Sequence, residues 1–264
     1  MLTLVTAFYT VKSKNCINKL KIWMKYMIDN VNNYNLVIYT DQYSLYFFDE
    51  VMETIDNNPR IRLILKPLIS LESYKYEEKW KSNSKRYSLV NVNDWQLNML
   101  WNEKVNFVND AYKNKYFDTE WYGWTDINYW RNRENIDLNS YDTLNWPNNE
   151  KLDVLNKEKV YYGRVNNNST YFWRLIKFIK QGYQTPIDQN SINSGFFIIN
   201  KDKIEWWYNT YNTQLQELFN KYVFIKDDLL VTINCIANYM EHFEIVTEHN
   251  TPYDNNFLFQ RYLL

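Results

Sequence analysis

Two groups of oxygen-bearing side chains stand at positions where an α/β protein carries its chemistry. Asp126-Ile127-Asn128 directly follows the apolar run 121–125, and Asp227-Asp228 precedes a helical pattern. Two oxygen donors at i and i+2 can turn to one side of the chain and share a hard divalent cation that also holds phosphate oxygens. Alternatively, Asp126 caps a turn and Asn128 is one of 38 background asparagines. Spacing alone leaves both interpretations open.

The two carboxylates at 227 and 228 allow a similar pair of interpretations. Carboxylates at a helix start cap the first turn and interact favourably with the helix dipole. We expect one of these two residues to be such a cap. The other carboxylate is then free to take part in chemistry.

Charge and glycine content exclude several modes of ligand binding. Thirty Lys+Arg against 31 Asp+Glu give a net charge of -1, which argues against a nucleic-acid partner. The four glycines, Gly123, Gly163, Gly182 and Gly195, are not spaced for a Walker A loop or a G-x-G-x-x-G fingerprint. Any bound nucleotide must therefore be held by something other than a glycine-rich phosphate-binding loop. Cys16 and Cys235 form neither a disulfide framework nor a zinc cluster, so we expect a reducing, cytoplasmic compartment.

The apolar patterns predict the elements that position these residues. Strands at 1–8, 36–40 and 61–65 alternate with helices at 17–31 and 44–55, which is typical of βαβ units and a parallel sheet. Further helices are expected at 94–112, 171–180, 201–222 and 227–240. Further strands are expected at 121–125, 160–163, 196–199 and 243–246. Residues 71–90 are expected to form a loop or a short helix, 131–158 an excursion from the sheet, and the last eighteen residues to wrap back.

We therefore predict a single α/β domain over residues 1–264, with a mostly parallel, Rossmann-like sheet flanked by helices. No basic region and cleavage site mark a signal peptide, and no stretch reaches the ~20 apolar residues of a transmembrane helix. Ligands of such sheets bind beyond the carboxyl ends of the strands. That rule selects residues 6–9, 40–41 and 126–128, together with Asn193-Ser194-Gly195 before a later strand.

The run Trp121-Tyr122-Gly123-Trp124-Thr125-Asp126-Ile127-Asn128-Tyr129-Trp130-Arg131 resembles the W-x-D-x-x-x-x-R region of the HtrL/YibB-type glycosyltransferase family. Residues 4–9 and 37–41 resemble that family too. The order of motifs is similar to GT-A glycosyltransferases of the glycogenin type: a D-x-D triplet, an Asn-Ser-Gly strand and an acidic helix start. The likeness spans residues 2 to about 235. The bias toward Asn, Lys, Ile and Tyr is typical of an AT-rich genome, such as that of a large DNA virus.

The resemblance implies a nucleotide-binding half, 1–130, and an acceptor-binding half, 131–264. In the first half Thr6, Ala7, Phe8 and Tyr9 would line the nucleoside pocket, Asp41 would meet the base or ribose, and Lys104 would contact the donor. The alternatives are ordinary strand-end packing and a solvated helix lysine. Gly195 would allow close approach of the sugar or acceptor, because it has no Cβ. Asp228, or else Asp227, would hydrogen-bond acceptor hydroxyls, act as general base or stabilise an oxocarbenium-like centre.

The resemblance also implies Mn²⁺ or Mg²⁺, held by Asp126 and Asn128 against the diphosphate. Asn128 replaces the usual second carboxylate, so the charge at the metal is reduced. His249 would be a third ligand and is better placed than His242, while a structural or solvent-exposed histidine is the alternative. Arg131 would suit either the diphosphate or the carboxylates of the 131–158 excursion.

The function implied by these motifs is transfer of a sugar from a UDP- or GDP-sugar to a hydroxyl on a glycan or protein. A carbohydrate-binding or scaffold protein on a degenerate transferase fold is the alternative, since 11 Trp and 24 Tyr could provide sugar-stacking platforms. A metal-dependent nucleotidyltransferase or phosphatase is a third interpretation, with fewer carboxylates than a two-metal site needs. The donor, the acceptor, the stereochemical outcome and the oligomeric state are not determined by the sequence.

Overall fold

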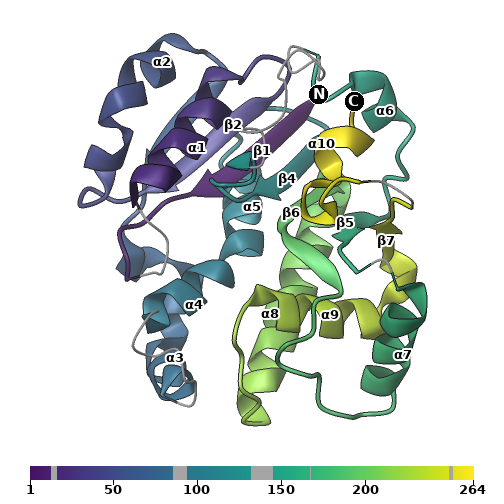
Figure 1. Ribbon diagram of the computed structural model, residues 1–264. Helices are drawn as coiled ribbons and strands as arrows, with labels where there is room; N and C mark the ends of the chain where they lie inside the picture. Colours follow the sequence, from purple (N-terminus) through teal and green to yellow (C-terminus); the bar gives the residue numbers. More distant parts are fainter. Residues whose placement is uncertain (13–16, 86–93, 132–144, 167, 250–251) are drawn as a thin grey trace.

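The computed structural model describes residues 1–12, 17–85, 94–131, 145–166, 168–249 and 252–264 (Figure 1). Its centre is a seven-stranded sheet in the order β3-β2-β1-β4-β6-β5-β7. The strands are β1 (Leu2–Ala7), β2 (Asn35–Thr40), β3 (Ile61–Leu65), β4 (Trp121–Thr125), β5 (Val160–Arg164), β6 (Ile192–Asn200) and β7 (Phe243–Val246). The predicted single α/β domain with a mostly parallel sheet and flanking helices is confirmed.

The sheet has a parallel part and a part that contains an antiparallel strand. β3, β2, β1 and β4 are parallel neighbours, whereas β6 runs antiparallel to both β4 and β5. β7 is parallel to β5 at the far edge. Because β6 runs against β4, the first residues of β6 lie beside the carboxyl end of β4. That reversal brings the Asn-Ser-Gly motif to the Asp126 triplet.

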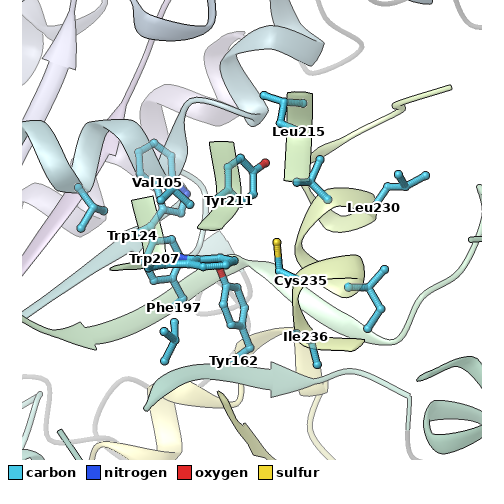
Figure 2. Close-up of a cluster of buried hydrophobic side chains, with 14 of the residues drawn as sticks. Val105, Trp124, Tyr162, Phe197, Trp207, Tyr211, Leu215, Leu230, Cys235 and Ile236 are labelled. Carbon is cyan, nitrogen blue, oxygen red and sulfur yellow. The ribbon is translucent and has the colours of Figure 1, made fainter. Parts of the chain in front are cut away.

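Alternating residues of the strands bury two hydrophobic clusters, one on each face. Val5, Trp124 and Phe197 point to one face, and Leu4, Phe196 and Ile198 point to the other. The first face is covered by α5 (Lys104–Lys113), α7 (Ser169–Lys180), α8 (Ile204–Asn220) and α9 (Asp228–Asn238). Figure 2 shows part of this cluster, where rings of strands and of α8 meet aliphatic side chains and Cys235 of α9.

The second face is covered by α1 (Ile17–Asp29) and by the C-terminal segment, including α10 (Phe259–Tyr262). Phe259 stacks on Phe196 of β6 with ring centroids 4.8 Å apart, so the end of the chain wraps back over the sheet as predicted. The remaining α-helices are α2 (Met52–Asn57), α3 (Glu77–Ser84), α4 (Trp95–Trp101) and α6 (Asn149–Asp153).

Three predicted elements are corrected. The helix expected at 94–112 is divided into α4 and α5 at residues 102–103, where the Glu103 N–H donates to the Leu100 carbonyl, three residues back instead of four. The helix expected at 44–55 is a 3-10 helix, Leu45–Val51, followed by α2. The strand expected at 196–199 begins at Ile192, so Asn193-Ser194-Gly195 lies inside β6 rather than before it.

Candidate active site

A cavity of about 360 Å³ opens at the carboxyl ends of β1 and β4. Its apolar wall is built by the residues after β1 and by side chains of α1, α4 and α5. Its polar end holds Lys104, Asp126 and Asn128. The lining residues are Ala7, Phe8, Tyr9, Thr10, Val11, Lys12, Ile17, Leu20, Leu97, Leu100, Trp101, Lys104, Phe107, Trp124, Asp126, Ile127 and Asn128. An apolar cleft with a few convergent polar groups is the usual form of a small-molecule site.

Lys104 connects two carboxylates at the polar end of this cavity. Its Nζ lies 3.1 Å from Asp126 Oδ1 and 3.1 Å from Asp228 Oδ2, and it donates to the main-chain oxygen of Ser194 at 3.0 Å. The lysine side chain is only 6% exposed. Burial by itself would lower the pKa of Lys104, but the two carboxylates outweigh it and the pKa is raised. The lysine is therefore charged and fixed in place.

Asp228 is the most perturbed carboxylate of the cluster. Burial raises its pKa to about 7, Lys104 opposes this effect, and the nearby charges of Asp227 and Asp126 add to it. Ser194 Oγ donates to Asp228 Oδ1 at 3.3 Å, so both carboxylate oxygens have partners. A carboxylate with a pKa near neutrality can exchange a proton at physiological pH.

Asp227 is the helix cap that the sequence predicted one of this pair to be. Its side chain accepts a hydrogen bond from the Leu230 N–H at 3.3 Å, at the start of α9. Burial raises the pKa of Asp227, while Lys226 acts in the opposite direction. The cap orients the first turn of α9 and so directs the next residue, Asp228, toward Lys104.

Gly195 gives Asp126 room beside β6. A Cβ added at Gly195 would lie 3.0 Å from Asp126 Oδ2 and 3.0 Å from Asn193 Oδ1. The Asp126 N–H donates to the Gly195 carbonyl at 2.8 Å, which joins the end of β4 to β6. A side chain at position 195 would therefore crowd the Asp126 carboxylate, and glycine leaves it uncrowded.

The other oxygen of the triplet, on Asn128, is held by Arg131. The guanidinium donates to the side-chain oxygen of Asn128 at 3.1 Å and to its main-chain oxygen at 3.2 Å, and it lies over the ring of Phe257. Arg131 is not among the residues that line the cavity. Its contacts are with Asn128 rather than with carboxylates of the 131–158 segment, of which residues 132–144 lie outside the described residues.

Part of the oxygen set around Asp126 is already engaged by cations and donors of the protein. Lys104 and the Trp124 indole hold Asp126 Oδ1, and Arg131 donates to the Asn128 amide oxygen. Gly195 leaves Asp126 Oδ2 free of a covering side chain, but the nearby Lys104 ammonium would repel a second cation. Within the described ranges, no three His, Cys, Asp or Glu side chains are grouped to hold a metal. An ion would therefore depend on the Asp126 carboxylate, the Asn128 amide oxygen and oxygens of a bound ligand. The predicted metal itself stays a prediction.

His249 follows β7, is exposed, and has a long contact from Nε2 to Thr247 Oγ1 at 3.5 Å. Its neighbour Glu248 is paired with Arg261, with Nη2 and Oε2 2.5 Å apart. Nothing in the described part of the chain joins His249 to Asp126, so its role as a third ligand stays a prediction. His242 packs against Trp206, with ring centroids 4.5 Å apart, and contacts Lys203.

The residues after β1 divide between the cavity and the core. Ala7, Phe8 and Tyr9 line the cavity, whereas Thr6 is fully buried in the strand. Phe8 is fixed by stacking on Phe47 at 3.5 Å between ring centroids. The Tyr9 hydroxyl donates to the main-chain oxygen of Lys66 at 3.0 Å, which leaves the edge of its ring for the cavity.

Asp41 lies beyond the end of β2 and accepts a hydrogen bond from the Ser44 N–H at 2.8 Å. It is not a lining residue of the cavity. Ser44 in turn accepts from the main-chain N–H of Thr10, which lines the cavity. The contact of Asp41 with a base or ribose stays a prediction, and in the structure its carboxylate orders the turn behind the cavity.

Two contributors to the site were not predicted from the sequence. The Trp124 indole donates to Asp126 Oδ1 at 2.7 Å, and α4 supplies Leu97, Leu100 and Trp101 to the apolar wall. Ser194 was selected as part of the Asn-Ser-Gly motif, and the structure shows that its partner is Asp228. The spacing of Trp124 and Asp126 is a usable signal, because residues two apart in a strand point to the same side. The contribution of α4 depended on the helix break at 102–103, which periodicity does not reveal.

No protein-family model matches the chain, and no curated protein matches its sequence. Its structure is similar to that of mouse xyloside xylosyltransferase 1, with a TM-score of 0.51 and 13% identity over 93% of this chain and 84% of that one. At this identity the likeness shows the fold alone. The chain has a GT-A-like glycosyltransferase fold, as the sequence predicted.

The structure also has weaker similarity to two other solved structures. One is to the bifunctional glycosyltransferase WbbM, with a TM-score of 0.42 and 11% identity over 93% of this chain and 38% of that one. The other is to 4-diphosphocytidyl-2C-methyl-D-erythritol synthase from Anaerococcus prevotii, with a TM-score of 0.35 and 8% identity over 98% of this chain and 96% of that one.

Proposed function

We propose that this chain is a glycosyltransferase that moves a sugar from a UDP- or GDP-sugar to a hydroxyl on a glycan or protein acceptor. The observation that carries the proposal is the cluster of Lys104, Asp126 and Asp228 at the polar end of the cavity. A nucleotide sugar has an apolar-faced base, a charged diphosphate and a sugar, and the cavity offers an apolar wall that ends in charged groups. The fold is also that of a glycosyltransferase.

The two halves of the chain would then divide the substrates. All the lining residues of the cavity fall between Ala7 and Asn128, which supports a donor-binding half at 1–130. Ser194, Gly195 and Asp228 belong to the second half and meet the cavity only at its polar end. We place the sugar and the acceptor hydroxyl at this junction.

The diphosphate would be the group that Lys104 and Asp126 recognise. As the bond from the sugar to the diphosphate breaks, negative charge develops on the leaving phosphate, and a fixed cation stabilises it. Lys104 is such a cation, and Lys12 and Arg131 lie nearby on the cavity lining and behind Asn128. When bound by Asp126 and Asn128, Mn²⁺ or Mg²⁺ would supply further positive charge to the diphosphate.

Asp228 would act on the acceptor side of the reacting carbon. Its pKa of about 7 lets it accept a proton from an acceptor hydroxyl or, as the anion, stabilise a positive sugar centre. Lys104 and Ser194 hold its two oxygens, so the carboxylate has one orientation.

The proposal is tested by nucleoside diphosphate release from a panel of UDP- and GDP-sugars, with hydroxyl acceptors and Mn²⁺. We expect turnover with at least one donor, and a loss of about a thousandfold in Asp126→Asn, the order found on removal of a main electrostatic group. Asp29→Asn is the matched control, since Asp29 pairs with Lys25 at 2.8 Å and is similarly exposed, at 38% against 34% for Asp126. Absence of turnover with every donor, or full activity of Asp126→Asn, would overturn the proposal.

A further inference from the structure

The helix α7 exposes aromatic and basic side chains on one face, which we call the α7 surface. Trp173 is 56% exposed, Phe178 39% and Tyr183, just beyond the helix, 57%. Phe178 and Tyr183 stack with ring centroids 4.6 Å apart. The surface consists of Trp173, Arg174, Lys177, Phe178, Lys180 and Tyr183, all exposed.

The opposite face of α7 is already occupied by the protein core. Phe172, Leu175, Ile176 and Ile179 are buried in the cluster beneath the sheet, against α9. Figure 1 shows α7 at the outer edge of the molecule beside α9. Packing therefore accounts for the apolar side chains of the inner face. On the outer face Trp173 meets Phe172 edge-on at 5.2 Å and Phe178 stacks on Tyr183, yet all three outer rings stay more than a third exposed.

The charge on this surface has one sign. Residues 165–187 contain Arg174, Lys177 and Lys180 and no Asp or Glu, in a chain whose net charge is -1. The exposed helix α1 provides a contrast, because its Lys21 and Lys25 pair with Glu50 and Asp29. Among the residues that the structure describes, no carboxylate forms an ion pair with the three cations of α7.

We propose that the α7 surface docks on an anionic lipid bilayer. Indole, phenyl and phenol rings favour the boundary between headgroups and acyl chains, and lysine and arginine beside them meet anionic headgroups. An acidic protein or a nucleic acid would use the three cations, whereas a bilayer uses the cations and the exposed rings together. No helix in the described residues is long and apolar enough to cross a membrane. The proposal does not depend on the proposed function.

The test is co-sedimentation of the whole chain with vesicles of phosphatidylcholine alone and of phosphatidylcholine mixed with phosphatidylserine. We expect binding to the mixed vesicles only, weakened by added salt. Lys177→Glu with Lys180→Glu should weaken it about twenty-five-fold or more, since each cation near an anionic surface contributes about fivefold. Trp173→Ser with Phe178→Ser should weaken it while keeping all three cations.

The matched control is Lys19→Glu with Lys25→Glu on α1, which changes the net charge equally at another exposed helix. Binding of this control like the unaltered chain supports the α7 surface, and thermal melts of each variant verify that it is folded. The proposal is overturned if the chain binds neither vesicle, if it binds both equally, or if the α1 control loses as much binding as the α7 variant. Binding to nucleic acid or an acidic protein without binding to vesicles also overturns it.

Discussion

The parallel and antiparallel parts of the sheet contribute to the site in different ways. The parallel strands β1 and β4, with α1, α4 and α5 and the residues that follow the two strands, enclose the cavity and supply its apolar wall. The antiparallel strand β6 and the helix α9 supply Ser194, Gly195 and Asp228, which contact the cavity only through Lys104 and Asp126. The first half of the chain therefore builds the pocket by itself, whereas the charged end of the pocket depends on the position of β6 and α9 from the second half.

Lys104 is the side chain that joins the two parts, so its removal should have the largest effect. Lys104→Met leaves Asp126 and Asp228 close together without their shared cation, and breaking a buried pair in this way costs about 3–5 kcal/mol. The loss of stability, measured by urea unfolding, should be greater at pH 8 than at pH 5.5. The pKa of Asp228 is already raised to about 7, and without Lys104 it rises further.

The direction of this pH dependence follows from the linkage between the protonation of Asp228 and folding. A carboxylate whose folded pKa is above its unfolded value stabilises the fold when protonated, and this stability is lost as pH rises through the folded pKa. At pH 5.5 Asp228 of the variant is protonated and its burial costs little. At pH 8 the variant must either bury a charged Asp228 or take up a proton, and each of these lowers its free energy of unfolding. Lys66→Met is the control, because Lys66 pairs with Asp110 at 2.7 Å but both side chains are about a quarter exposed. It should cost no more than about 1 kcal/mol at either pH; an equal loss in both variants would contradict the account.

Substitution of Gly195 tests the junction of the two parts of the sheet, because Gly195 lies where β6 meets the end of β4. A Cβ in Gly195→Ala would crowd Asp126 Oδ2 and Asn193 Oδ1 at 3.0 Å and move the carboxylate. We expect turnover in the sugar-nucleotide assay to fall, but by less than the roughly hundredfold that a misplacement of about 1 Å causes, because a contact at 3.0 Å moves the carboxylate by only a few tenths of an ångström. The melting temperature should change little, because the crowded atoms are side-chain ends.

Gly163→Ala on β5 is the matched control for that substitution. A Cβ there would meet Phe259 at 3.5 Å, an ordinary contact, away from the cavity. This variant should keep both its turnover and its stability. If Gly163→Ala loses as much turnover as Gly195→Ala, the effect at Gly195 reflects the sheet in general rather than the Asp126 carboxylate.

Much of the fold could be predicted because hydrophobic periodicity is local. The ranges of β4 and β7 and the βαβ order of the first three strands follow from short apolar runs between turn residues. The direction of β6 could not be predicted, since a fully buried strand has the same apolar pattern whichever way it runs. The break between α4 and α5 could not be predicted either, because the change in backbone hydrogen bonding at Glu103 leaves the apolar spacing of the two helices unaltered.

Part of the candidate site could be predicted, because the ends of strands and helices are visible in the sequence. Asp126, Asn128 and Asp228 were selected as polar residues at element ends, and Asp126 and Asp228 meet at Lys104. Asp41, Arg131 and His249 were selected by the resemblance to glycosyltransferases, but none of the three lines the cavity. Asp41 and His249 contact residues outside the lining, and Arg131 reaches the cavity only through Asn128. Whether a polar residue at the end of a strand or helix lies in the cavity depends on packing between distant parts of the chain, and residue spacing does not reveal that packing.

The central claim is that the cavity between β1, β4 and α4 holds a nucleoside diphosphate against Lys104 and Asp126. Calorimetric titration of the chain with UDP and GDP, in Mn²⁺ and in chelator, tests it most directly. We expect one binding site for at least one of the two nucleotides, with affinity weakened by chelator and by Asp126→Asn. Absence of binding to either nucleotide, together with binding of a glycan alone, would contradict the account and identify a carbohydrate-binding protein on this fold.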